Sequence, residues 1–191
     1  MKSIIENEFN AHTQAINNSV KVVIKDIENA AKISIDCLKN GNKILIFGNG
    51  GSAADAQHIA AEMTGRFKTQ RKGLSAIALT TDTSALTSIG NDFGFDKIFE
   101  RQVEALANKG DTLIGISTGG SSLNVINALK LAKGLKCKTI GFSGRDGGEF
   151  NSICDVNIIA RSDDTPRIQE LHMLVGHTIC HLIDQAFLDS N

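Results

Sequence analysis

The chain has 191 residues, of which 41% are hydrophobic, and its formal net charge is −1. This length and apolar content suit one α/β domain with a full core, so we expect a single domain over residues 1–191. The near-neutral charge offers no basic surface to nucleic acid or to an anionic membrane, and neither is expected as a partner.

The sequence shows no export or membrane signal. No apolar run approaches the roughly 18 residues that a membrane span needs, and the polar segment 1–10 lacks the apolar stretch of a signal peptide. These features predict a cytoplasmic protein. The four cysteines, at positions 37, 137, 154 and 180, form no C-x-x-C pair, which indicates core thiols rather than a zinc knuckle or a redox pair.

The hydrophobic pattern predicts a long helical region followed by alternating strands and helices. Apolar residues recur at helical spacing from Val20 to Leu38, and Asn40-Gly41 provides a stop, so the first region should cover about 1–40. Short apolar runs predict buried strands at 43–47, 76–80, 112–116, 139–142 and 156–159. Helical patterns lie at 52–66, 96–107, 122–133 and 165–188. This order predicts a doubly wound, five-stranded parallel sheet sandwiched by helices.

Three of the predicted strands open into loops of glycine and serine. These are Gly48-Asn-Gly-Gly-Ser52, Ser117-Thr-Gly-Gly-Ser-Ser122 and Ser143-Gly-Arg-Asp-Gly-Gly148. The carboxyl ends of parallel strands share one edge of the sheet, where such folds bind ligands. Glycine lets backbone N–H groups approach an anion, hydroxyls add donors, and the following helix contributes its positive end. We therefore expect phosphate binding, although tight turns and helix caps use the same residue types.

The nucleotide-binding patterns fit these loops poorly. No lysine stands in a P-loop arrangement, and Gly48-Asn-Gly-Gly51 lacks the G-x-G-x-x-G spacing. A sugar phosphate is therefore favoured over a nucleotide.

The predicted helix 52–66 is mostly apolar but carries one polar stripe. Asp55, His58 and Glu62 fall at i, i+3 and i+7 on that stripe. Because i and i+4 side chains meet, His58 and Glu62 could ligate a metal or share proton transfers. An exposed face with a local His–Glu pair explains the same pattern equally well.

The C-terminal helix has a well-marked start, with Thr165 as a cap and Pro166, the only proline, at the first helical position. His172 lies on its apolar stripe and is interpreted as a core histidine. His177 lies nearly opposite, and with His181 it has the i, i+4 spacing of a metal pair, so spacing alone does not single out His177. The polar side, which also carries Glu170 and Asp184, could face solvent or a subunit interface.

Taken together, the motifs resemble the phosphoheptose isomerases, a family built on the sugar-isomerase (SIS) fold, over essentially the whole chain. The resemblance rests on Gly48-Asn-Gly-Gly-Ser-Ala-Ala-Asp-Ala-Gln-His58, Glu62-Met-Thr-Gly-Arg66, Gly90-Asn-Asp-Phe-Gly94, Gly115-Ile-Ser-Thr118 and Arg167-Ile-Gln-Glu-Leu-His172 with His177. It implies a homotetramer, with active sites at subunit interfaces, that converts D-sedoheptulose 7-phosphate to D-glycero-D-manno-heptose 7-phosphate. That step would begin nucleotide-activated heptose synthesis for lipopolysaccharide or another surface glycan.

The resemblance also implies roles for individual residues. Glu62 and His177 become the catalytic acid/base pair of an enediol mechanism. One Zn²⁺ per subunit would be held by His58, Glu62, Gln169 and His177. The implied substrate contacts are Asn49, Gly50, Gly51, Ser52, Glu62, Asn91, Asp92, Ser117, Thr118, Gly119, Ser122 and Gln169.

Two positions depart from the family pattern. Gly119 stands where the family commonly has the third hydroxyl of a Ser-Thr-Ser run, so one phosphate donor is missing or replaced by backbone. Pro166 stands where some members carry an acidic residue, so no proton relay is assigned to that position.

Two rival interpretations come from other SIS proteins. The first is a non-catalytic tetramer that helps DnaA assemble at the replication origin; that group lacks the carboxylate and histidine that stand here as Glu62 and His177. The second is a sugar-phosphate-sensing regulator. Such proteins usually carry a DNA-binding domain, and a chain of 191 residues is too short to add one to the predicted SIS domain. The enzyme is therefore the favoured interpretation.

Overall fold

The structure is a computed structural model that describes residues 1–188. Its elements, in chain order, are α1 (Lys2–Lys39), β1 (Ile44–Gly48), α2 (Gly51–Thr64), β2 (Ala76–Ala78), α3 (Thr83–Phe93), the 3₁₀ turn η1 (Phe95–Lys97), α4 (Glu100–Leu106), β3 (Thr112–Ile116), α5 (Leu123–Gly134), β4 (Lys138–Gly144), α6 (Phe150–Ile153), β5 (Val156–Ala160) and α7 (Thr165–Ala186). No helix among these is long and apolar enough to cross a membrane.

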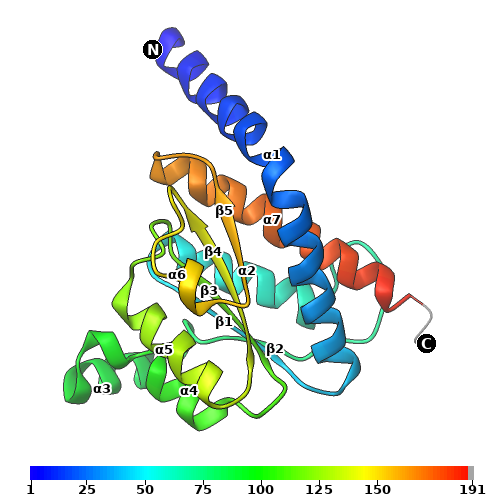
Figure 1. Ribbon diagram of the computed structural model, residues 1–191, viewed down its shortest axis with the longest axis vertical. Coiled ribbons are helices and arrows are strands. Elements are labelled where there is room, and N and C mark those ends of the chain that lie inside the picture. Colours follow the sequence, from blue (N-terminus) through cyan, green and yellow to red (C-terminus); the bar gives the residue numbers. More distant parts are fainter. Residues whose placement is uncertain (189–191) are drawn as a thin grey trace.

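The five strands form one parallel sheet in the order β2-β1-β3-β4-β5, with helices on both faces (Figure 1). The chain leaves β1 toward one edge of the sheet and returns to pair β3 on the other side of β1. This reversal brings the carboxyl ends of β1 and β3 together, and Gly48 pairs with Ile116 in the register. The predicted doubly wound sandwich is confirmed, and the crevice between these two strand ends is the expected ligand position.

Both faces of the sheet are buried, which explains why its strands are continuous apolar runs. In β1, Ile44 and Ile46 join the core under α1, α2 and α7, whereas Leu45 and Phe47 join the core under α4, α5 and α6. Of the four cysteines, which are all free thiols, three are buried and Cys154 is half-buried. The prediction of core thiols is confirmed.

The helices differ from prediction in three places, one of which is the short helix α6, which no pattern predicted. Helix α3 was not predicted, although Leu86, Ile89 and Phe93 recur at helical spacing and the first two pack against the core. Its start is fixed by Asp82, whose side chain accepts from the amide of Ala85 at 2.9 Å. The predicted helix 96–107 is split into η1 and α4, because Ile98 and Phe99 between them turn into the core.

The C-terminal end of α7 is fastened by a buried ion pair. Asp184 Oδ1 accepts from Arg71 Nε at 2.6 Å, and both side chains are almost fully buried. The other oxygen of Asp184 accepts from the amides of Lys68 and Thr69, while Arg71 donates to the carbonyls of Glu62 and Met63 at the end of α2. The prediction that Asp184 faces solvent or an interface is wrong, because this pairing draws its carboxylate into the protein.

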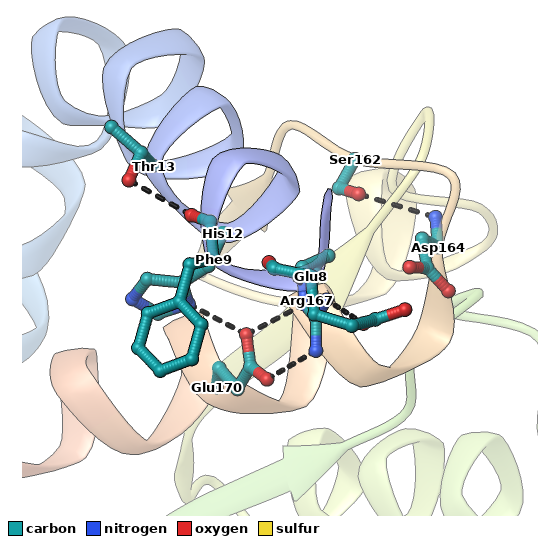
Figure 2. A network of polar contacts seen from close by, with 8 residues as sticks. All are labelled: Glu8, Phe9, His12, Thr13, Ser162, Asp164, Arg167 and Glu170. Atoms are coloured by element: carbon teal, nitrogen blue, oxygen red, sulfur yellow. Dashed lines mark hydrogen bonds and ion pairs between the residues drawn. The ribbon is translucent and has the colours of Figure 1, made fainter. Parts of the chain in front are cut away.

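The N-terminal end of α7 is held against α1 (Figure 2). Arg167 forms a two-bond contact with the Glu170 carboxylate at 2.7 and 2.5 Å and an ion pair with Glu8 of α1, and His12 Nδ1 lies 2.6 Å from Glu170 Oε2. The helix begins at Thr165 with Asp164 as its N-cap residue, one residue earlier than predicted. Glu170 is therefore used to join α1 to α7.

Candidate active site

The loops after β1 and β3 lie side by side and are fastened by two asparagines. Asn49 Nδ2 donates to Asn124 Oδ1 at 2.9 Å, and Asn124 Nδ2 donates to Asn49 Oδ1 at 2.8 Å. A β-carbon at position 48 would lie 2.8 Å from both the carbonyl oxygen of Ile116 and the β-carbon of Ser52, so only glycine fits there. The structure brings two of the three predicted loops together at one edge of the sheet.

The segment Ser117–Ser122, called the hydroxyl loop below, presents its hydroxyls at the start of α5. Ser117 is buried, and its Oγ lies 2.9 Å from Oγ of Ser122. Ser122 is the N-cap residue of α5, yet its side chain makes no capping hydrogen bond. Thr118 and Gly119 between them are half-buried. The cluster combines free hydroxyl capacity with a positive helix end, the combination that binds phosphate groups.

A second cluster forms between α2 and α7. His58 Nε2 lies 3.2 Å from Glu62 Oε1 and 3.0 Å from His177 Nε2. One ligand atom from each of these three residues lies within 4.8 Å of the other two. The i, i+4 pair on α2 was predicted from spacing; its partner 119 positions along the chain was implied by the resemblance alone.

The close approach of α2 and α7 depends on Gly176. A β-carbon at this position would lie 2.6 Å from Cδ1 of Ile59, inside any normal contact. His177 follows Gly176 and His58 precedes Ile59, so this contact brings the two histidines close together. Phe67 stacks on the His177 ring with centroids 5.2 Å apart and holds its orientation.

Gln169 reaches from the start of α7 to the start of α2. A β-carbon at Gly51 would lie 2.4 Å from Gln169 Nε2, so the amide of Gln169 occupies the space that a side chain at 51 would need. Gln169 is thus packed on the loop Gly48–Ser52, called the glycine loop.

Asp55, one turn before His58, is a half-buried carboxyl group. Its Oδ2 atom is buried and has no hydrogen-bond partner within residues 1–188. Burial raises the pKa of Asp55 to about 6, and the nearby His58 opposes this shift. The polar stripe of α2 therefore continues from His58 and Glu62 to Asp55, nearer the start of the helix, as the i, i+3, i+7 spacing predicted.

The chemistry of the donors tests whether a cation fits. Two imidazole nitrogens and a carboxylate oxygen converge on one point, and the two Nε2 atoms face each other. Histidine nitrogen and carboxylate oxygen are common ligands of Zn²⁺. The residues of this cluster therefore fit a divalent cation of that class.

Other predicted residues lie apart from these clusters. Asn91 and Asp92 are exposed on α3, and the amide of Asn91 donates to Asp92 Oδ1 at 2.8 Å. No hydrogen bond within residues 1–188 joins either side chain to the loops or to the histidine cluster. His172 is a buried core histidine, as predicted, and its Nε2 lies 2.9 Å from the Ser143 carbonyl oxygen. His181 is half-buried against Phe67, outside the His58 cluster.

Sequence reasoning missed two groups that shape the site. Asn124, which pairs with Asn49, carried no signal beyond its place in the first turn of a predicted helix. Arg71 and Asp184 pair across 113 positions and fix the end of α2 just after Glu62. No periodic pattern reveals such a pair, because each partner lies in a different element.

The parallel α/β sheet, the hydroxyl loop and the His–Glu–His cluster fit a sugar-phosphate isomerase of the SIS type, and comparison with known proteins agrees. The SIS domain family model matches residues 8–144. The phosphoheptose isomerase of Aliarcobacter butzleri is 64% identical over 96% of this chain and 97% of its own length. That of Helicobacter hepaticus is 57% identical over 96% of this chain and 93% of its own.

A solved structure agrees with these sequence relatives. Phosphoheptose isomerase from Neisseria gonorrhoeae superposes with a TM-score of 0.92 and 46% identity, covering 96% of this chain and 98% of that one. The chain belongs to the phosphoheptose isomerase family of SIS-domain proteins. The expected enzyme class, a sugar-phosphate isomerase, is confirmed.

Proposed function

We propose that the protein converts D-sedoheptulose 7-phosphate to D-glycero-D-manno-heptose 7-phosphate, the first step toward nucleotide-activated heptose for lipopolysaccharide or another surface glycan. The observation that carries the proposal is the convergence of His58, Glu62 and His177 between α2 and α7, in a fold whose hydroxyl loop is suited to phosphate. The names of the relatives support a heptose phosphate as the substrate class.

Two regions of the site would divide the substrate between them. The phosphate would bind the hydroxyl loop, through Ser117, Thr118, the backbone at Gly119, and Ser122. The glycine loop, with Asn49, Gly50, Gly51 and Ser52, would contact the sugar next to Gln169. Asn91 and Asp92 would contribute further contacts, as the family resemblance implies.

The proposed reaction is an aldose–ketose isomerisation through a cis-enediol. Glu62 removes a proton from C1 of the ketose and returns it to C2, while His177 transfers the proton between the oxygens on C1 and C2. The carbonyl moves from C2 to C1 and no atom is gained or lost. Arg71 donates to the backbone carbonyl of Glu62 and so fixes the last turn of α2, which supports this role for Glu62.

The cation site would be formed by His58, Glu62, Gln169 and His177. A Zn²⁺ ion there supplies a Lewis acid toward the substrate carbonyl. A carboxylate that binds a metal tightly is a weaker base, so the two roles assigned to Glu62 compete. Metal titration of turnover measures that competition directly.

The active protein would be a cytoplasmic homotetramer of single-domain subunits, with active sites at subunit interfaces. An exposed apolar face on α1 and α7 supports association: Val20, Ile24 and Leu174 are 44%, 60% and 49% exposed. Together with the other residues that line the groove between these helices, they form a surface suited to burial against another subunit.

The test is NMR observation of the aldose product from sedoheptulose 7-phosphate. Glu62→Gln and His177→Gln should each lower kcat by about 10²- to 10⁴-fold, because each removes a proton-transfer group. His181→Gln, one turn further on α7, is the matched control and should keep normal turnover. Chelation should remove activity and added Zn²⁺ should restore it.

Two outcomes would count against the proposal. Near-normal turnover in Glu62→Gln or His177→Gln would remove that residue's role. No turnover by a folded wild-type oligomer under any metal condition would remove the assigned reaction.

A further inference from the structure

The hydroxyl loop contains no cation of its own. Neither Ser117–Ser122 nor the first turn of α5 includes lysine or arginine. A phosphate monoester carries about −1.5 to −2 charges at pH 7, whereas hydroxyls are neutral and a helix end contributes only a partial charge. The charge of such a ligand is therefore only partly balanced by the loop itself.

The guanidinium of Arg145, which follows β4, lies beside this loop. A β-carbon at Gly119 would lie 3.8 Å from Arg145 Nη1 and 3.2 Å from Ser121 Oγ. The space next to Gly119 is thus flanked by a hydroxyl on one side and a positive charge on the other. Within residues 1–188 the Arg145 side chain forms no ion pair or hydrogen bond, so its donors are available to a ligand.

The backbone around Arg145 is locked onto the hydroxyl loop. The amide of Glu149 donates to the Gly120 carbonyl at 3.0 Å. A β-carbon at Gly120 would lie 2.2 Å from the carbonyl oxygen of Gly147, and one at Gly148 would lie 2.4 Å from that of Gly119. Only glycine permits this contact, and the close packing of the two loops holds the backbone of Arg145 beside the hydroxyl loop.

Arg145 is also anchored on its other side. Its amide donates to the Ser162 carbonyl at 3.1 Å, and its φ is 57°, a left-handed conformation that is unfavourable for arginine. The fold therefore maintains an arginine in an unfavourable backbone conformation at the rim of the proposed phosphate site. A residue kept this way at a ligand edge suggests a role outside folding.

We propose that Arg145 is a substrate-binding residue that supplies the positive charge of the phosphate site, beside the hydroxyls of Ser117, Ser121 and Ser122. Guanidinium donors form strong, charge-assisted hydrogen bonds to phosphate oxygens. This inference rests on the proposed function, because it assigns the phosphate of the substrate to the hydroxyl loop.

Arg161 offers a matched control for Arg145. Both arginines are exposed, both line the same hollow of about 360 Å³, and each follows a strand of the sheet. The β-carbon position of Gly119 has Arg145 within 4 Å but not Arg161. Removing the charge of Arg161 therefore measures the long-range electrostatic effect of a nearby arginine on phosphate binding. Removing the charge of Arg145 measures that effect together with the proposed direct contact to phosphate.

The test compares wild type, Arg145→Gln, Arg145→Lys and Arg161→Gln. All keep a β-carbon, so the backbone at 145 stays equally constrained. For each, KM and kcat are measured with sedoheptulose 7-phosphate, and the affinity for inorganic phosphate is measured by calorimetric titration. Arg145→Gln should raise both KM and the phosphate Kd by about 10- to 100-fold with kcat within about threefold. Arg145→Lys should recover much of the loss, and Arg161→Gln should stay within about twofold of wild type.

The outcomes separate this inference from the proposed function. Unchanged KM and phosphate Kd in Arg145→Gln would overturn the inference, and so would equal losses of affinity in Arg145→Gln and Arg161→Gln. In either case, isomerisation by the wild type would still support the proposed function. A wild type that binds phosphate through Arg145 but leaves the heptose phosphate unchanged overturns only the reaction. A wild type with neither phosphate affinity nor turnover overturns both.

Discussion

Helix α7 is held at its two ends by the same residue types, an arginine and a carboxylate, in opposite environments. At the C-terminal end, Arg71 and Asp184 have side chains that are 2% and 0% exposed. At the N-terminal end, Arg167 is itself only 9% exposed, but its partner Glu8 has a side chain that is 60% exposed. Removing one partner of a buried ion pair leaves the other charge buried without a counter-charge. Removing an exposed carboxylate costs little, because water solvates the arginine atoms that it contacted. The comparison predicts a gradient of sensitivity along the helix that carries Gln169 and His177.

The largest effect is expected at the buried end. Asp184→Asn should lower the free energy of unfolding by about 3–5 kcal/mol, because it leaves the Arg71 guanidinium buried without its counter-charge. Urea denaturation at fixed protein concentration measures the change. Glu104→Gln, which breaks the exposed pair with Arg101, is the control and should have no measurable effect. A loss below about 1 kcal/mol in Asp184→Asn would show that the buried pair is dispensable.

The middle of the helix tests burial without a charged partner. Burial lowers the pKa of His172 to about 4, against the hydrogen bond to Ser143, which opposes the shift. Above the unfolded-state pKa of about 6.5 this histidine is neutral in both states and does not lower the free energy of unfolding. As the pH falls from about 6.5 toward 4, the unfolded state binds the proton first, so the free energy of unfolding decreases. Between pH 7 and pH 4.5 the wild type should lose about 2 kcal/mol more than His172→Gln. Equal acid sensitivity in denaturation curves of the two proteins would contradict this assignment.

The smallest effect is expected at the exposed end. Glu8→Gln removes one of two carboxylates from Arg167 but leaves the two-bond contact with Glu170 in place (Figure 2). The melting temperature should fall by no more than about 2 °C at matched concentration. A larger fall would mean that the contact between α1 and α7 depends on this pair rather than on apolar packing.

The parts of the fold that follow hydrophobic periodicity were predictable from sequence. The strand at 112–116 was predicted with its observed bounds, and α1 ends at the predicted Asn40-Gly41 stop, because burial on both sheet faces and a helix stop leave local signals. Helix α3 was missed although Leu86, Ile89 and Phe93 recur at helical spacing, a stripe of only three residues.

The site was predictable only where neighbours in sequence are neighbours in space. The pair His58 and Glu62 follows from helical spacing, and the hydroxyl loop follows from its composition. Contacts across the fold, such as His58 with His177 or Gly119 with Arg145, arise from the way α2 meets α7 and β3 meets β4. Such contacts depend on packing between elements, which single-sequence periodicity does not encode.

The missing side chain at Gly176 has a consequence for how the site could change over time. The separation of His58 from His177 is set by how deeply Ile59 can sit against α7, so the width of the cation site is decided one residue away from its ligands. A side chain at 176 would require Ile59 or the two helices to shift, and a shift of the helices would change the distance between ligands that are themselves unchanged. In this protein the packing of Ile59 against Gly176 in the core therefore helps to set the distance between the two histidines of the site.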